Sequence, residues 1–223
     1  PINFVDPWDQ WLQKSLADSR EQLGDCWLDT YLTSPIWRFV LSPSVAGRFA
    51  WAGVLMPSVD RVGRYFPLTL ACPLPDSSNP IFVMTGAKAW YETAESLVLT
   101  CLDDQFDLKT FDRQVIELGP PPTTLRAGAL RRGPWDARRM PLPTDIEKAC
   151  PEMLYQALGE LFFAFSLWWS HGSQQVEPSL LLCQGLPPSH GFSAMMEAEW
   201  ERWGWKETIR LTAADENSSR ASR

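Results

Sequence analysis

The chain has 223 residues, of which 45% are hydrophobic and 21% charged, a balance typical of a globular protein that buries a substantial core. Its formal net charge of −7 argues against a nucleic-acid partner. The longest apolar stretch, Leu161–Trp169, is much shorter than the about 20 residues of a membrane helix, so we expect no insertion into a bilayer.

The sequence lacks the motifs that are typical of enzymes and cofactor sites, namely the phosphate loop, the dinucleotide fingerprint and the nucleophile elbow. Its two histidines, His171 and His190, lie in turn-like sequence, and two histidines cannot form a multi-histidine metal site. We therefore expect no catalytic residue, metal or cofactor, although a carboxylate site assembled across the fold stays open. The five cysteines include no Cys-x-x-Cys pair, which indicates reduced, buried thiols in a cytoplasmic protein.

Two amphipathic helices are predicted at the start of the chain. Asp6-Pro7 begins the first, because aspartate can cap free amides and proline suits the first helical position, and Gly24 ends it. The second covers Asp25–Thr33. Tryptophan and leucine recur at helical spacing in both. This aromatic face is interpreted as core packing, and an exposed protein-binding face is the alternative.

Three strands follow at residues 36–41, 51–57 and 65–72, and their connections are too short for a parallel crossover, which predicts antiparallel neighbours. The second and third strands are fully apolar, which favours a central position in a sheet that is covered on both faces. Pro67 argues for an edge or a bulge instead, because proline cannot donate a hydrogen bond to a neighbouring strand.

The turn between the second and third of these strands concentrates charge. It contains Ser58, Asp60, Arg61 and Arg64, and Gly63 permits a positive φ. In one interpretation Asp60 pairs with the arginines and fixes the turn. In the other, a charged loop on rigid strands recognises a partner, and these four residues are candidate partner-binding residues.

Further helices are predicted in the middle of the chain. Residues 81–84 are apolar but too few to assign. Ala87–Leu102 has the apolar stripe of an amphipathic helix, and Leu108–Leu118 forms a second one that Asp107 caps.

Residues 119–143 differ in character, since they are rich in proline and arginine with a single acidic residue. We predict a long connection, which is either a solvated insert or a basic arm that contacts an acidic protein partner. Nucleic acid is the weakest of the alternatives. Arg131 and Arg132 of this arm join the candidate partner-binding residues.

The rest of the chain is predicted to complete the sheet. Thr144–Glu147 has the pattern of a capping box, and a helix or pair of helices should run to about Leu158 with an interruption near Pro151. Leu161–Ser170 could form a buried strand or a buried helix, and its aromatic residues and the polar turn that follows favour a strand at 162–170. A further strand is expected at 179–184, and a helix at Phe192–Trp203. The sequence thus predicts a single domain over residues 1–205, followed by a polar tail at 206–223.

Two adjacent tryptophans in the fourth predicted strand indicate whether one or both faces of the sheet are covered. Trp168 and Trp169 point to opposite sides of a strand, so both are buried only if both faces of the sheet are covered. The residues therefore predict a central, largely antiparallel sheet of about five strands with helices on both faces.

Several stretches of the chain resemble the TagF proteins, which are accessory proteins of bacterial type VI secretion systems. The clearest is Met56-Pro-Ser-Val-Asp-Arg-Val-Gly-Arg-Tyr-Phe-Pro-Leu-Thr69. The others cover residues 4–12, 24–39, and 166–173 with 180–185, so the resemblance extends from residue 4 to about residue 205. The family usually opens with Tyr-Gly-Lys and Gly-Asp-Phe, which are missing before Pro1, so we expect a further N-terminal piece.

The resemblance implies a fold and a function. The fold is a three-layer α/β/α sandwich around a largely antiparallel or mixed sheet. The function is a non-enzymatic, post-translational repressor of type VI secretion that binds and sequesters the forkhead-associated scaffold protein in the cytoplasm. The resemblance supplies no binding residues, so the candidates above rest on charge and loop placement.

Two other classes of function stay open. One is a structural or assembly component of the secretion apparatus, which would co-sediment with assembled sheath or baseplate. The other is an enzyme with a cryptic site. Some family members resemble fusions to a metal-dependent phosphatase, but this chain is too short for that domain and lacks its Asp-Gly-x-Gly segments, so we expect no turnover of a phosphopeptide with Mn²⁺.

Overall fold

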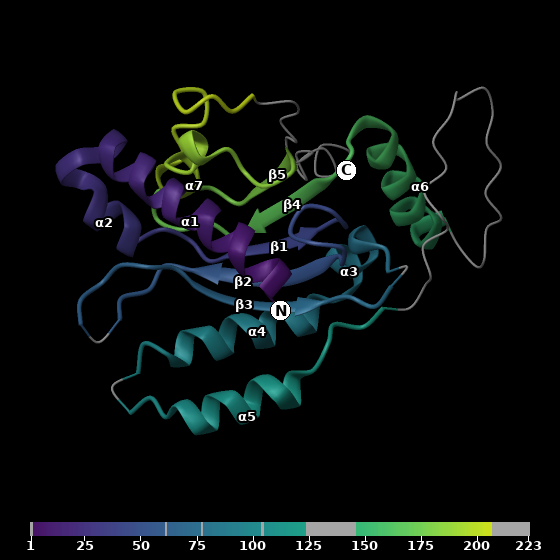
Figure 1. The fold of residues 1–223 in the computed structure, drawn as a ribbon, viewed down its shortest axis with the longest axis horizontal. Coiled ribbons are helices and arrows are strands. Elements are labelled where there is room, and N and C mark those ends of the chain that lie inside the picture. The colour runs from purple at the N-terminus through teal and green to yellow at the C-terminus, as the bar shows by residue number, and fades with distance from the viewer. Residues whose placement is uncertain (1, 61, 77, 104, 124–145, 207–223) are drawn as a thin grey trace, which may run out of the picture.

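The computed structural model describes residues 2–60, 62–76, 78–103, 105–123 and 146–206. It contains one sheet with helices on both faces (Figure 1). The elements in chain order are α1 (Ile2–Leu23), η1 (Gly24–Cys26), α2 (Trp27–Leu32), β1 (Trp37–Leu41), β2 (Trp51–Met56), β3 (Leu68–Pro73), α3 (Pro80–Gly86), α4 (Lys88–Thr100), α5 (Leu108–Leu118), α6 (Ile146–Leu161), β4 (Phe165–Ser170), β5 (Ser179–Gln184), η2 (Ser189–Gly191) and α7 (Ala194–Glu197).

The sheet has five strands in the order β3-β2-β1-β4-β5, and every neighbouring pair is antiparallel. All five predicted strands are confirmed, although β3 and β4 begin three residues later than expected. A central position was expected for the apolar strands, and Pro67 argued for an edge; the first is confirmed for β2 and the second for β3. Strand β2 is buried throughout, whereas β3 begins directly after Pro67 and forms an edge.

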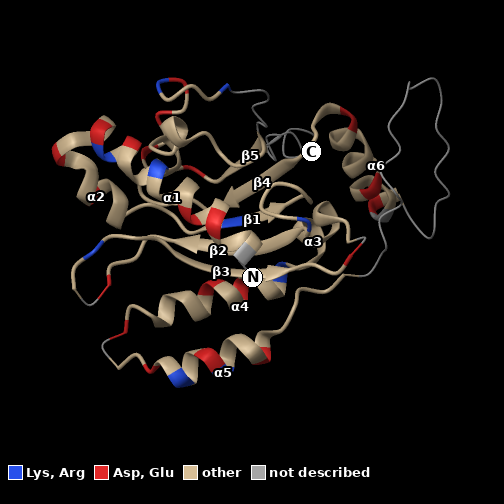
Figure 2. Cartoon of the chain, viewed as in Figure 1, with Lys and Arg blue, Asp and Glu red and all other residues tan. Residues whose placement is uncertain are grey.

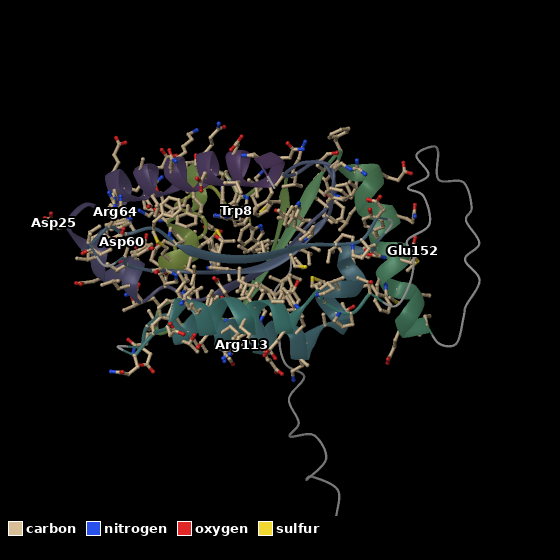
Figure 3. All side chains as sticks on the ribbon, turned by 60° about the horizontal axis from the view of Figure 1, so that its bottom comes forward. Trp8, Asp25, Asp60, Arg64, Arg113 and Glu152 are labelled. Atoms are coloured by element: carbon tan, nitrogen blue, oxygen red, sulfur yellow. The ribbon has the colours of Figure 1, made fainter. Side chains whose placement is uncertain are left out.

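The sheet separates two apolar layers, which gives the three-layer α/β/α sandwich that was expected (Figure 3). Alternate residues of β1 point to opposite faces, so Phe39 packs under α1 while Val40 packs under α4. Helices α3 and α4 lie directly on the second face, α6 packs against α3, and α5 lies outside α4.

The tryptophan-rich layer under α1 is core, as predicted. The Trp168 side chain is fully buried, with its ring centroid 5.8 Å from that of Trp8 and 5.0 Å from that of Phe39. On the opposite face, half-buried Trp169 meets the Tyr91 ring of α4 at 4.8 Å. The condition on the two adjacent tryptophans is therefore met, because both faces of the sheet are covered.

An ion pair connects α4 to the central strand. The Arg38 guanidinium of β1 donates from Nε and Nη2 to the two carboxylate oxygens of Glu95, each at 2.7 Å. The charge of Arg38 also lies 5.7 Å from the centre of the Tyr91 ring. The five strands carry no other charged residue, and charge in Figure 2 lies otherwise on helices and connections.

Two predictions that rested on proline are wrong. Helix α1 begins at Ile2 rather than at Asp6-Pro7, because Phe4 is buried against the Trp51 ring at 4.1 Å and this packing holds an additional turn. Helix α6 runs through Pro151 without interruption. Pro151 lies in the second turn, where its missing N–H removes one bond near the helix start, and the Pro151 carbonyl accepts a hydrogen bond from Asn79 Nδ2 at 3.1 Å.

Two short elements also differ from expectation. Residues 81–84, left unassigned, belong to α3, where Asn79 accepts the N–H groups of Ile81 and Phe82 and Pro80 occupies the first turn. The helix expected at Phe192–Trp203 is limited to α7, because Ala198 takes a left-handed backbone with φ of 64° and turns the chain back. The Thr144–Glu147 capping box lies partly outside the described residues, and the predicted domain limits stay a prediction.

The cysteines are unpaired, as expected, but most of them are not buried. Cys183 alone is buried, and burial raises the pKa of its thiol to about 12. Cys26 and Cys150 are exposed because they lie near helix ends, outside the apolar layers. None of the described helices combines the length and the apolar character that spanning a bilayer requires.

Candidate protein-binding surface

Asp60 accepts the hydrogen bonds that stabilise the described part of the β2–β3 turn. Its Oδ1 accepts the backbone N–H groups of Val62 at 3.0 Å and Arg64 at 2.8 Å, and its Oδ2 accepts Arg64 Nε at 2.6 Å. The backbone and side-chain hydrogen bonds from Arg64 are the main reason that the pKa of Asp60 is lowered. Gly63 turns the chain with φ of 80°.

A cluster of aromatic side chains from α2 and the turn itself connects this turn to the rest of the fold. The hydroxyl of Tyr31 on α2 donates to the Ser58 carbonyl and accepts the Ser58 N–H, both at 2.9 Å. The Tyr31 ring stacks on Trp27 at 4.9 Å and meets Tyr65 edge-on at 6.1 Å. Figure 3 places Asp60 and Arg64 together at one end of the molecule, so the loop presents a preformed charged surface there.

A groove of about 540 Å³, lined by both polar and apolar groups, lies beside the loop. It is lined from three directions, by the end of α2, by the strand end and turn at Met56–Val59, and by the end of α4 with the connection that follows it. Four of its large aliphatic side chains are exposed, namely those of Leu32, Val59, Leu99 and Leu102. Large exposed apolar side chains are ordinary when scattered, but a gathered set is typical of a protein-interaction site.

The polar lining of the groove is acidic and neutral. Asp103 lies on its rim, and the hydroxyl-bearing residues Ser34 and Ser58 lie on its other side. The nearby cation Arg64 is already paired with Asp60. A ligand for this groove would therefore combine apolar side chains with hydrogen-bonding groups, with any compensating charge positive.

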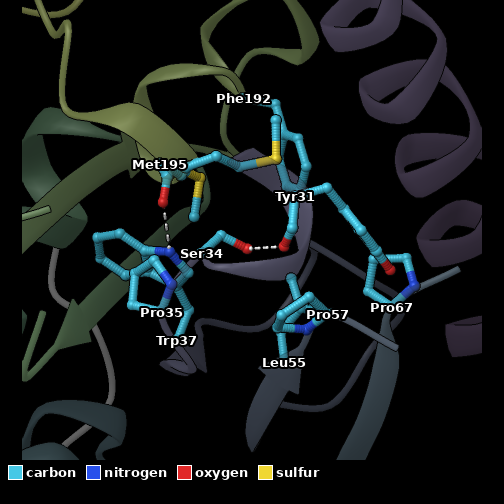
Figure 4. Close-up of a pocket in the computed structure, with 10 residues that line it drawn as sticks. Tyr31, Ser34, Pro35, Trp37, Leu55, Pro57, Pro67, Phe192 and Met195 are labelled. Atoms are coloured by element: carbon cyan, nitrogen blue, oxygen red, sulfur yellow. Dashed lines mark hydrogen bonds between the residues drawn. The ribbon is translucent and has the colours of Figure 1, made fainter. Parts of the chain in front are cut away.

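A second hollow, between α2 and the C-terminal segment, is too small to bind a ligand. Its volume is about 20 Å³, enough for about one water molecule. Figure 4 shows two hydrogen bonds between the residues that line it. Ser34 Oγ donates to the Tyr31 carbonyl at 2.7 Å, and Trp37 Nε1 donates to the Met195 carbonyl at 3.0 Å. Within the described ranges, no group of three or more His, Cys, Asp or Glu side chains is placed to hold a metal ion.

Three of the six candidate partner-binding residues lie within the described part of the chain. Ser58, Asp60 and Arg64 share the anchored turn, and the predicted pairing of Asp60 with an arginine is observed for Arg64. The role of the turn in recognition stays a prediction. The remaining candidates lie outside the described residues; these are Arg61, Arg131 and Arg132.

Sequence reasoning missed the groove. Leu99 and Leu102 belong to the helix predicted at Ala87–Leu102 but lie off its apolar stripe, and apolar residues off the stripe were the sign in the sequence of an exposed apolar surface. Leu32 and Val59 carry no comparable signal, because only the tertiary fold brings them beside α4.

Comparison with known proteins identifies the family. The model of the TagF N-terminal domain, described as type VI secretion system-associated, matches residues 1–118, which is more than half of the chain. The chain belongs to the TagF family. The matched part contains the whole loop and every element that lines the groove, so this surface lies on the TagF domain itself.

A solved structure extends the likeness to the full chain. The crystal structure of PA0076 from Pseudomonas aeruginosa PAO1 is 36% identical in sequence, with a TM-score of 0.79 over 96% of this chain and 90% of that chain. The TagF-like architecture thus includes β4, β5 and the C-terminal segment as well as the matched domain. No curated protein matches this chain.

Proposed function

We propose that this TagF protein is a non-enzymatic negative regulator of type VI secretion, which binds the forkhead-associated scaffold protein in the cytoplasm and keeps it from assembly. One observation supports this most: a hydrogen-bonded charged loop and an open groove with exposed leucines adjoin on the domain that defines the family. A preformed surface of this kind suits docking, because little conformational entropy is lost when it binds.

The charged loop is tested by reversing its arginines. Arg61→Glu with Arg64→Glu is expected to abolish scaffold binding in titration calorimetry while leaving the far-ultraviolet circular dichroism unchanged. The matched control is Lys88→Glu with Arg113→Glu, which makes the same charge change on α4 and α5 at exposed positions. Binding that survives the loop variant would remove the loop from the mechanism.

The groove is tested by Leu102→Lys, since Leu102 is 62% exposed and the substitution should not disturb the fold. A buried hot spot is worth about 2 kcal/mol or more, so we expect scaffold affinity to fall at least about tenfold. The variant should also fail to repress secretion when it is produced in excess in the bacterium. Unchanged repression by Leu102→Lys would exclude the groove as the repressing surface.

A further inference from the structure

The free edge of β5 has a defined hydrogen-bonding pattern. Strand β5 is the end strand of the sheet, and no strand pairs with its outer edge in the described part of the chain. The N–H of Gly185 donates to the Ala164 carbonyl at 2.9 Å, in register with the β4–β5 pairs. Because alternate residues of an antiparallel strand bond to the same neighbour, the odd-numbered residues of β5 bond to β4 and the even-numbered ones point outward. The outward residues are Leu180, Leu182 and Gln184.

The same residues carry exposed apolar side chains. Leu180 is 62% exposed and Leu182 44%, whereas Leu181 is buried under α1. Both exposed leucines point to the face that α3 and α4 cover further along the sheet. The open backbone edge and the open apolar face thus coincide on one strand.

Within its own six residues, β5 lacks the sequence features by which proteins prevent strand addition. Charged side chains, prolines and bulges are the usual ones. Strand β5 has no charge and no proline, and it pairs with β4 without interruption. A proline precedes both edge strands, Pro67 before β3 and Pro178 before β5, but only β3 contains one, Pro73.

We propose that β5 is the contact between two copies of this chain, paired antiparallel about a two-fold axis at Leu182. In this register Leu182 faces its own copy and Leu180 faces Gln184, which gives about six hydrogen bonds, two for each pair. The leucines of both copies join into one apolar cluster, and the two sheets become continuous.

The lack of charge on β5 allows a second copy to occupy this edge. The chain has a net charge of −7, so two copies repel each other over most of their surfaces. Strand β5 is uncharged from Ser179 to Gln184, and identical neutral strands meet there without opposed like charges. Two-fold dimers are also the commonest protein oligomers. Because the β2–β3 loop lies at the other edge of the sheet, the proposed scaffold-binding loop and groove of each copy would stay accessible in the dimer.

Sedimentation velocity of the full chain over a concentration series tests the proposal. The unchanged chain should form a dimer at micromolar concentration, and Leu182→Lys should sediment as a monomer, because it places two ammonium groups opposite each other. Leu102→Lys is the matched control and should remain dimeric. A monomeric parent chain, or a Leu182→Lys dimer as stable as the parent, overturns the proposal.

A mixing experiment tests the two-fold axis itself. Leu182→Glu should also be monomeric, and an equal mixture of Leu182→Glu and Leu182→Lys should recover a dimer, because opposite charges then face each other. No recovery on mixing contradicts the register. Slow amide exchange at Leu180 and Gln184 in monomeric Leu182→Lys would mean that the same chain already covers the edge, which also overturns the proposal. These outcomes are independent of scaffold binding, which Leu182→Lys should retain.

Discussion

The buried ion pair between Arg38 and Glu95 allows a quantitative prediction. The two side chains are 5% and 19% exposed, so Glu95→Gln leaves the Arg38 charge uncompensated within the protein. Breaking such a pair costs about 3–5 kcal/mol, and the partial exposure of Glu95 places the expected loss near the lower end, at about 3 kcal/mol. For a chain of this size, that corresponds to a decrease in Tm of roughly 6–12 °C.

Urea unfolding followed by tryptophan fluorescence measures this loss, because the tryptophans Trp8, Trp168 and Trp169 lie at the two faces of the sheet. The matched control is Glu92→Gln on the same helix. Glu92 pairs with Lys88 at 3.7 Å in an exposed position, so its substitution should cost no more than about 0.5 kcal/mol. The reasoning is refuted if Glu95→Gln loses less than about 1 kcal/mol, or if both variants lose the same amount.

Three further predictions concern the loop anchor, the thiols and the sheet. Burial raises the pKa of Tyr31 from 10.0 to about 12, so its contribution to stability is present below pH 10 and is lost as the pH rises to 12. Tyr31→Phe should reduce the alkaline loss of stability in urea unfolding, and the remainder comes from Tyr91 and Tyr155, whose pKa values burial also raises. Cys26 and Cys150 should react quickly with a thiol reagent and Cys183 only after unfolding, so early labelling of Cys183 would contradict its placement. Gly53→Ala should prevent folding, because a Cβ there would lie 2.4 Å from the Leu70 carbonyl oxygen; a soluble variant with native circular dichroism would refute this.

The strands were predictable because their signals are local. Short apolar runs bounded by turn residues identified all five, and the turn at Gly63 followed from its sequence. The α5 helix was predicted with its limits and its Asp107 cap, which accepts the Thr110 N–H at 2.9 Å. Each of these elements is specified by residues close together in the chain.

The remaining features depend on contacts between distant residues. The early start of α1 rests on Phe4 packing against Trp51, and the shortened helix near the C-terminus depends on Trp205, whose indole donates to the Gly191 carbonyl at 2.8 Å. The groove is assembled from α2, β2 and α4. Such features become visible only when the fold is known, whereas the helix cap at Asn79 was readable in the sequence and was overlooked.

The central claim is that this TagF protein acts by docking through its loop and groove, and titration calorimetry against the purified forkhead-associated scaffold protein tests it most directly. We expect saturable binding by the full chain, at least about tenfold weaker binding by Leu102→Lys, and parental affinity for Leu182→Lys. Absence of binding by the parent chain, or equal binding by all three proteins, would contradict the claim.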